Sequence, residues 1–414
     1  MFAETTGVLH RNPDFRRLFI ASLISMMGDW FSFVAVAGLL TEITHRASTA
    51  SYAYAAMVLP IFLAAPFAGA LADRFDRRRM MLIADIVRVP LAASLIAAAH
   101  WQSVSLAIAA VVLLGIAAAF SDPVASAALP NLVSDDDLPM AQAMFSASWG
   151  AMLIVGAALG GLTAAYLGKN AAFAIDAASF AISAAVLLRV RTPMQKFATT
   201  KAARALSPQL PPPPLWPHLR SSPITVRLLL AKGGVSSANG TVGLLPGLLV
   251  AAYAGGDKAL GLVLAARGFG VMLGPPLARR IAGRRPSVRG IVWVCGISTI
   301  TYAAAYALVP LMPWLIGTMA LVALAHLGGG AQWTLSSYGL QSRTPDQLRG
   351  RIMSLDYGLA TLAIGGSAII AGLIADATSV ATAMWALTAV AGVYGVCWGI
   401  AVWPWAKRSK TMPA

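Results

Sequence analysis

Residues 54–98 contain the pattern that decides the fold. An apolar run, YAAMVLPIFLAAPFAGALA at 54–72, is followed by a short basic break, DRFDRRR at 73–79, and then by a second apolar run, MMLIADIVRVPLAASLIAA at 80–98. About 20 predominantly apolar residues are enough for one α-helix to cross the hydrocarbon core of a membrane. The two runs therefore predict two spanning helices, and the break between them predicts a loop at the membrane surface.

The same pattern continues along the whole chain. Of its 414 residues, 58% are hydrophobic and only 11% are charged, and the mean hydropathy is +0.72. Because a soluble protein carries about 25% charged residues, lipid rather than water must face most of this surface. We expect an all-α polytopic membrane protein with about twelve transmembrane helices in two pseudo-symmetric six-helix bundles. The predicted spans are 16–40, 50–72, 80–99, 103–129, 141–166, 170–190, 224–254, 258–281, 290–310, 313–338, 352–375 and 379–403.

The net charge of +15 comes mainly from basic residues in the breaks between the apolar runs. When the N-terminus is placed in the cytoplasm, the outer loops keep only Arg46, Lys169 and Lys258. By the positive-inside rule, this asymmetry predicts a multi-pass protein of the inner (plasma) membrane with both termini cytoplasmic. Because the positive charge follows topology, it does not indicate a nucleic-acid partner.

A polar, basic stretch with four consecutive prolines interrupts the chain at 191–223. Since proline cannot continue a helix and favours an extended spacer, we expect an N-terminal six-helix bundle at 1–190, a cytoplasmic linker at 191–223, and a C-terminal six-helix bundle with a short basic tail at 224–414. The halves also repeat weakly, with LADR at 71–74 matching LARR at 277–280. Such internal symmetry is expected of transporters, and we expect a monomer.

Charged side chains inside the first bundle are candidates for mechanism, because a charge at the bilayer centre costs about 2.5–3.5 kcal/mol on insertion scales. Asp29 lies in the first predicted span, and Asp85 and Arg88 share one helical face of the third. An Asp85–Arg88 pair or an Asp29–Arg88 bridge could hold the bundle together. Alternatively, a protonatable Asp29 facing a cavity could couple proton entry to transport. Asp176 is expected near a helix end, in a positional role.

The second bundle has its own candidates, Arg267 in the eighth span and His326 in the tenth. Arg267 could bind an anionic group, or it could form a buried pair with Asp356 or Asp257. His326 could exchange a proton, or it could be a hydrogen-bonded packing residue. Lys232 is expected close enough to the inner end of the seventh span to extend its amine to the interface.

Three further side chains, Trp30, Gln332 and Trp333, fall deep enough in their spans to line a cavity in which a substrate could stack. The chain contains no Gly-Lys-Ser/Thr phosphate-binding loop, so a gradient rather than ATP must supply energy for transport. Its two cysteines, Cys295 and Cys397, have no metal-ligand spacing. We therefore expect no metal site, no cofactor and no enzymatic activity.

Particular motifs add to this interpretation. GALADRFDRR at 69–78 resembles the loop between helices two and three of the major facilitator superfamily in residue type, spacing and position. LPNLV at 129–133 and LQSRTPDQLRGR at 340–351 resemble the branch that contains enterobactin exporters and macrolide efflux pumps. Two features depart from this pattern. GAALGG at 156–161 lacks a proline that family exporters often carry in helix five, and span four lacks the arginine of many proton-coupled drug antiporters.

The resemblance implies a conformational latch at the loop between helices two and three. Its residues are Gly69, Asp73, Arg74, Arg77 and Arg78. The latch partner that the resemblance implies is the cytoplasmic start of helix eleven, and the contact forms in one conformation and breaks in the other. Topology alone is the competing explanation for the arginines.

The resemblance also implies secondary active export, by alternating access, of a hydrophobic or amphiphilic organic compound such as a drug or a siderophore-like molecule. Protons are the expected coupling ion, in antiport with a small organic substrate, and membrane lipid surrounds the protein. A transporter of a lysophospholipid or another lipid-like substrate, an uncoupled facilitator, and a non-transporting membrane sensor remain as alternatives.

Overall fold

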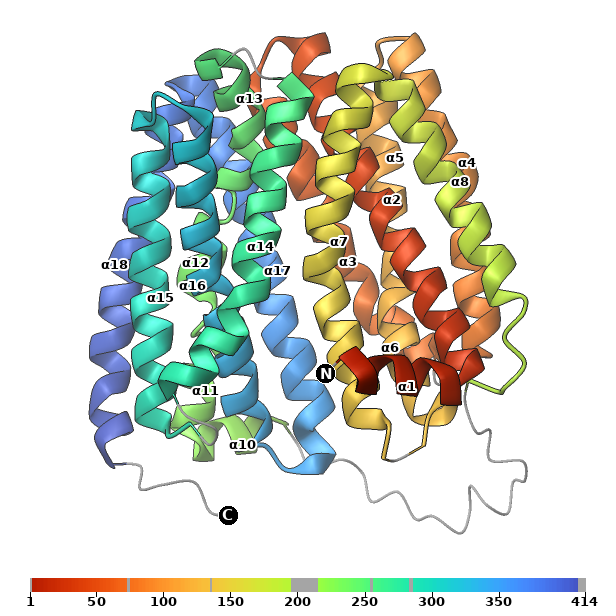
Figure 1. The fold of residues 1–414 in the computed structure, drawn as a ribbon. Helices are drawn as coiled ribbons and strands as arrows, with labels where there is room; N and C mark the ends of the chain where they lie inside the picture. Colours follow the sequence, from red (N-terminus) through yellow and green to blue (C-terminus); the bar gives the residue numbers. More distant parts are fainter. Residues whose placement is uncertain are drawn as a thin grey trace.

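The computed structural model describes residues 2–72, 75–134, 136–194, 215–253, 256–282 and 286–408. Within these ranges the regular secondary structure is entirely helical (Figure 1). The first half consists of α1 (Phe2–Arg11), α2 (Pro13–Thr44), α3 (Ala47–Ala72), α4 (Arg77–His100), α5 (Val104–Ala119), α6 (Asp122–Leu132), α7 (Leu138–Tyr166) and α8 (Lys169–Leu187). The second half consists of α10 (Leu215–Ser221), α11 (Pro223–Leu229), α12 (Gly233–Ala238), α13 (Thr241–Tyr253), α14 (Gly256–Ala282), α15 (Val288–Leu308), a 3-10 turn (Val309–Leu311), α16 (Leu315–Gln341), α17 (Asp346–Ala377) and α18 (Val380–Arg408).

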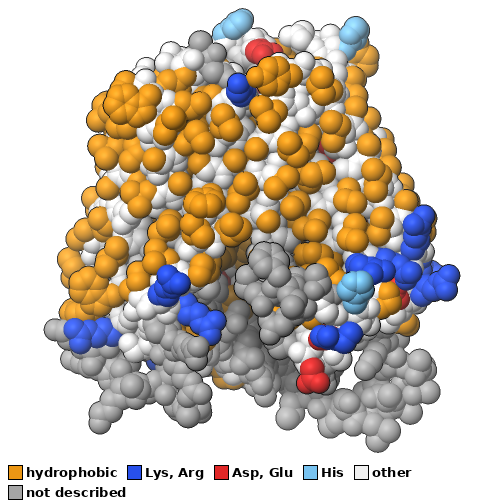
Figure 2. Space-filling model, viewed as in Figure 1, with side chains coloured by type: hydrophobic (Ala, Val, Ile, Leu, Met, Phe, Trp, Pro, Cys, Tyr) orange, Lys and Arg blue, Asp and Glu red, His pale blue; other side chains and the backbone are white. Residues whose placement is uncertain are grey.

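Long apolar helices dominate this structure, as the sequence predicts. Eleven helical stretches of the described residues are long and apolar enough to cross a membrane, and Ser48–Ala64 in α3 is a shorter apolar stretch. Together they account for each of the predicted spans. Figure 2 shows hydrophobic side chains around the middle of the molecule and Lys and Arg gathered toward the end where α1 lies. An all-helical polytopic membrane fold is therefore confirmed.

Two predicted spans are broken rather than continuous. The span at 103–129 divides into α5 and α6 at Phe120–Ser121, because Pro123 starts a new helix where its missing N–H is not needed. The span at 224–254 contains α11, α12 and α13, with glycines next to both breaks. The predicted linker at 191–223 also contains a helix, α10; residues 195–214 of that linker lie outside the described residues.

Each half packs around its own helices. In the first half, α2 packs against α7 and α8, and α4 packs against α8; in the second, α16 packs against α14 and α15, and α15 against α18. Contacts between the halves run mainly along α7 with α14 and along α3 with α17. α1 and the C-terminal end of α18 lie at the same end of the molecule (Figure 1). The side of the membrane that this end faces stays a prediction.

At the end occupied by α1, three side chains join residues 11–12 to the segment before α7. Arg11 Nε and Asn12 Nδ2 donate to Asp137 Oδ2 at 3.2 and 2.8 Å. These donors, the Arg11 guanidinium first, lower the pKa of the Asp137 carboxyl to about 2. Asp137 precedes α7, so its ionised carboxylate joins α1 to the start of that helix across the physiological pH range.

Polar side chains join the two halves at the opposite end of the molecule, which we call the closed end. Lys169, at the start of α8, donates to Glu42 of α2 at 2.6 Å and pairs with Asp257 of α14 at 2.9 Å. Ser48 of α3 donates to Asp376 of α17 at 2.6 Å. The Glu42 carboxylate is exposed, whereas the Lys169 and Asp257 side chains are only 15% and 8% exposed, so the Lys169–Asp257 pair between the halves is shielded from water.

Glycines let the halves approach closely beneath these pairs. A Cβ at Gly161 of α7 would lie 2.5 Å from the Asp257 carbonyl oxygen and 2.8 Å from the Gly261 Cα of α14. A Cβ at Gly261 would lie 2.5 Å from the Ala157 carbonyl oxygen. Since backbone atoms fill the space on both sides, side chains other than hydrogen at these positions would separate α7 from α14.

Gly161→Val is therefore expected to open the closed end. Overpacking by a branched side chain costs about 1–3 kcal/mol, which corresponds to at least about a fivefold increase in the open population. The measurement uses Ser51→Cys as a reporter, since Ser51 is fully buried between α3 and α17, in purified protein whose two native cysteines are replaced by serine. Maleimide should label this reporter at least about fivefold faster when Gly161→Val is present.

Gly399→Val is the matched control, because a Cβ at Gly399 meets open space. An equal labelling rate for the Gly161 and Gly399 variants would contradict a role for the glycine contact in closure.

Candidate functional site

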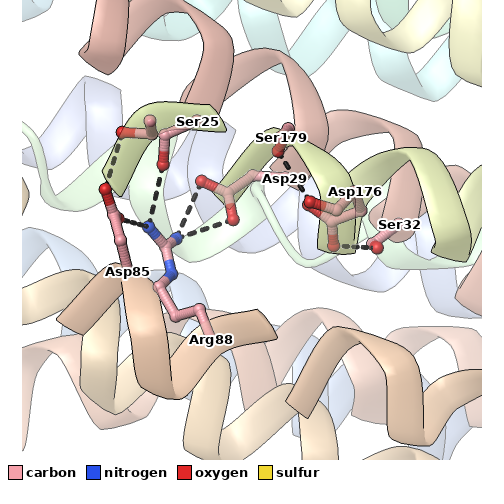
Figure 3. Close-up of polar contacts among 8 residues, drawn as sticks. Ser25, Asp29, Ser32, Asp85, Arg88, Asp176 and Ser179 are labelled. Carbon is pink, nitrogen blue, oxygen red and sulfur yellow. Dashed lines mark hydrogen bonds and ion pairs between the residues drawn. The ribbon is translucent and has the colours of Figure 1, made fainter. Parts of the chain in front are cut away.

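A polar cluster centred on Arg88 lies inside the first half, where α2, α4 and α8 meet (Figure 3). The Arg88 side chain is 1% exposed. Its Nη2 donates to both oxygens of Asp29, at 2.7 and 2.9 Å, and its Nη1 donates to Ser25 Oγ at 3.0 Å. Ser25 and Asp29 are one helical turn apart on α2, so they present their oxygens to Arg88 together. The structure therefore contains the Asp29–Arg88 bridge.

Asp85 is a weaker partner of the same guanidinium. Its Oδ1 lies 3.8 Å from Arg88 Nη1, and its Oδ2 accepts a 2.6 Å hydrogen bond from Ser183 of α8. The Phe180 ring lies 4.2 Å from Arg88 Cζ and covers the guanidinium on that side. Asp85 thus ties α4 to α8, whereas the short bond of Arg88 goes to α2.

The third carboxylate of the cluster is Asp176, which the sequence did not identify as a site residue. It lies within α8 rather than near a helix end, is fully buried, and accepts a hydrogen bond from Ser32 of α2. Its Oδ1 has no hydrogen-bond partner in the described part of the chain. A Cβ at Gly28 would lie 2.5 Å from this oxygen, so only glycine lets α2 approach it here. The sequence does contain a signal for this site: Asp176, Ser179 and Ser183 are spaced so that their polar side chains share one face of a helix.

Asp29 and Asp176 border a cavity of about 140 Å³ inside the first half. The Asp29 side chain is 36% exposed, in contrast to the buried Arg88 and Asp176, so Asp29 is the acid that faces the open space. The walls are otherwise mainly apolar and aromatic, and they include Trp30, Phe33, Met57, Leu114 and Trp149. The cavity can therefore hold water or a small group next to a carboxylate that is already paired.

Lys232 is not at the membrane interface, which corrects its expected position. It is 3% exposed at the break between α11 and α12, pairs with Asp356 of α17, and donates to Ser337 at 2.9 Å. Trp333 of α16 covers the ammonium at 4.6 Å from its ring centre. This pair holds the second half together much as Arg88 and Asp29 hold the first.

The prediction that Arg267 pairs with Asp356 or Asp257 is wrong. Asp356 binds Lys232, and Asp257 binds Lys169. Arg267 is instead 5% exposed and donates through Nη2 to the Tyr54 hydroxyl of α3 at 3.3 Å.

His326 lies in an aromatic group of the second half. Its Nε2 is 3.0 Å from the Tyr306 hydroxyl, and its ring packs edge-on against Tyr302 and Tyr306. This geometry matches the alternative of a hydrogen-bonded packing residue.

The predicted substrate-lining residues do not meet in one cavity. Trp30 lines the cavity of the first half. Gln332 is 1% exposed, and its amide accepts from Thr299 at 3.3 Å and donates to the Ala231 carbonyl. Gln332 and Trp333 therefore pack α16 against its neighbours, and they lie apart from the cavity of the first half.

Two residues of the predicted latch bind backbone carbonyl groups of other helices. Arg77 Nη1 donates to the Ala127 carbonyl at 2.6 Å, and Arg78 Nε donates to the Leu187 carbonyl at 3.0 Å. Leu187 is the last residue of α8, so the Arg78 contact suits the negative end of that helix dipole. Asp73 and Arg74 lie outside the described residues, and Gly69 is in the last turn of α3. The latch stays a prediction.

Solved structures of other transporters share this fold. A bacterial homologue of the human lysosomal transporter Spinster, in an inward-facing and unoccupied conformation, matches with a TM-score of 0.74 and 14% identity over 97% of this chain and 99% of its own. The nucleoside transporter NupG matches with a TM-score of 0.69 and 14% identity over 96% and 100%. At these identities the similarity establishes the fold alone.

Sequence comparison finds relatives along most of the chain. The enterobactin exporter EntS of Citrobacter koseri is 27% identical over 400 residues, which are 91% of this chain and 89% of that protein. An uncharacterized MFS-type transporter of Mycobacterium tuberculosis is 28% identical over 368 residues, 84% and 81% of the two chains. The profile of the Major Facilitator Superfamily matches residues 18–355. The chain therefore belongs to the Major Facilitator Superfamily and is a membrane transporter, not an enzyme.

Proposed function

We propose that this transporter is a proton-coupled exporter of a hydrophobic or amphiphilic organic compound. The observation that carries the proposal is the position of Asp29, which binds Arg88 and also faces the cavity of the first half. The similarity to an enterobactin exporter supports export of an organic molecule. The largely apolar walls of this small cavity suit an apolar group of such a substrate next to Asp29.

Alternating access requires the two halves to separate at one end and approach at the other. At the closed end, the Lys169–Asp257 pair and the Gly161–Gly261 contact are the links to be broken. The glycine contact involves little apolar surface, and the two partners of the ion pair come from different halves, so both links are lost when the halves separate. If the termini are cytoplasmic, this structure corresponds to the state closed to the outside.

Proton coupling follows from the charges around Arg88. Asp29 and Asp85 contact the one buried guanidinium, and Asp176 borders the same cavity as Asp29 and Arg88. With all four groups ionised the cluster has an excess of negative charge, which a low-dielectric environment opposes. Binding a proton removes part of this excess. Asp29 is the exchange site because the cavity reaches it, and a substrate in the cavity would compete with that proton.

Asp29→Asn is expected to abolish gradient-driven transport while substrate exchange at equilibrium continues, because asparagine keeps the shape but cannot release a proton. The measurement is transport by proteoliposomes under an imposed proton gradient, screened with lipophilic cations, macrolides and siderophores. For each compound that wild type accumulates, exchange without a gradient is measured in parallel. Asp136→Asn is the matched control, since Asp136 is exposed in a loop. Accumulation by Asp29→Asn at the wild-type level would refute coupling through Asp29.

Arg88→Gln tests the charge balance independently of transport. Removing the guanidinium leaves buried carboxylates without a counter-charge, which costs about 3–5 kcal/mol. We expect a clear drop in the thermal unfolding temperature of the purified protein at neutral pH, and partial recovery when Asp29→Asn is added. The recovery is expected because the double variant has fewer uncompensated charges. If adding Asp29→Asn lowers the unfolding temperature further, packing of the side chains rather than charge balance stabilises the cluster.

A further inference from the structure

The surroundings of Arg267 suit a residue that binds a ligand better than a residue in an ion pair with the protein. It lies within α14, is 5% exposed, and its nearest polar contact is the Tyr54 hydroxyl at 3.3 Å. Tyr54 belongs to α3 of the other half, and it donates in turn to Asn239 at 2.8 Å. The guanidinium thus sits where the two halves meet, the region in which transporters of this architecture bind their substrates.

Among the residues that the structure describes, no acid pairs with Arg267. The buried carboxylates of the second half, Asp257 and Asp356, are paired with Lys169 and Lys232. Nε and Nη1 of Arg267 make no hydrogen bond to any described residue. A buried guanidinium with two unused donor atoms is costly to keep, so its presence calls for a partner that is not part of the chain.

Aromatic residues complete the surroundings. Tyr302 and Tyr306, whose ring centres are 4.9 Å apart, belong to the same buried core as Tyr54, the hydrogen-bond partner of Arg267. The Tyr302 hydroxyl, like two of the Arg267 nitrogens, has no hydrogen-bond partner among the described residues. Leu264, one turn before Arg267 on α14, is fully buried in the same apolar core. One cation and an unused hydroxyl inside apolar and aromatic walls would recognise an acidic group attached to an apolar body.

We propose that Arg267, with Tyr302, binds the carboxylate or phosphate of an anionic amphiphile, and that this anion is the substrate. The assignment rests on the proposed transport function and narrows its substrate class. A planar guanidinium can bind such a group through two parallel hydrogen bonds. Because Tyr54 and Arg267 belong to different halves, opening the closed end parts them and exposes the donors.

The competing explanation is that Arg267 only anchors Tyr54 and so helps to close the two halves. The two explanations differ in what they require of a ligand. An anchor needs no ligand charge, whereas an anion site must prefer a negatively charged compound over its neutral and cationic analogues. Binding at equilibrium measures this preference without a proton gradient, so its result is independent of the coupling proposed through Asp29.

The experiment measures binding of 1-naphthoate, 1-naphthylmethanol and 1-naphthylmethylammonium to the full-length protein in phosphatidylcholine nanodiscs by calorimetry. Wild type should bind naphthoate at least about tenfold more tightly than the other two, since hydrogen bonds to charged groups contribute about 1.5–3 kcal/mol. Arg267→Gln should lose this preference, and Arg267→Lys should retain part of it. Arg279→Gln is the matched control, because Arg279 lies on the same helix and is exposed.

Tyr54→Phe separates the two explanations if Arg267→Gln does not fold. It removes the hydroxyl that an anchor needs, yet it leaves the guanidinium, so an anion site keeps its preference for naphthoate. Competition by lysophosphatidic acid but not by lysophosphatidylcholine would identify a lipid headgroup as the source of the anion, and competition by neither would identify a soluble acid. Equal binding of the three naphthalene probes by wild type, or unchanged naphthoate preference in Arg267→Gln, would overturn the proposal.

Discussion

An uncompensated charge in hydrocarbon is energetically costly, and this cost determines which helices of the protein pack together. Arg88 with Asp29 and Lys232 with Asp356 are buried pairs, and each joins helices that are distant in sequence within one half. Such pairs add little net stability compared with well-packed apolar residues, but breaking one of them is strongly unfavourable. They therefore fix which helices meet inside a half. Movement is left to the surface between the halves, where the contacts are of a different kind.

That surface combines glycine contacts with polar links at its edge. Gly161 and Gly261 bring α7 and α14 together without interlocking side chains, and the Lys169–Asp257 pair joins the two halves at the closed end. The glycine contact can separate without pulling interlocked side chains apart. The contrast between firmly paired halves and a separable surface is what rocking motion of two rigid units requires.

The helices could be predicted from the sequence because apolar length alone identifies a membrane span. The Asp29–Arg88 bridge was open to prediction because only a few charges lie deep in the first half. Asp176 was missed because its partner Ser32 comes from another helix, and only packing brings them together. Lys232 was placed at the interface for a similar reason. The break between α11 and α12 puts it opposite Asp356, and hydropathy does not register such a break.

The two proposed sites lie in different halves, and this separation has an electrical consequence. The excess of negative charge is around Arg88, whereas the unbalanced positive charge is Arg267. If an inward proton exchanges for an outward monoanion, both movements carry positive charge inward. A membrane potential supplies about 2.3 kcal/mol per elementary charge per 100 mV, so such an exchange uses the potential twice and the pH gradient once. Export of an anion is therefore the direction that an inside-negative membrane favours, which makes an anion site and a proton site physically compatible in one exporter.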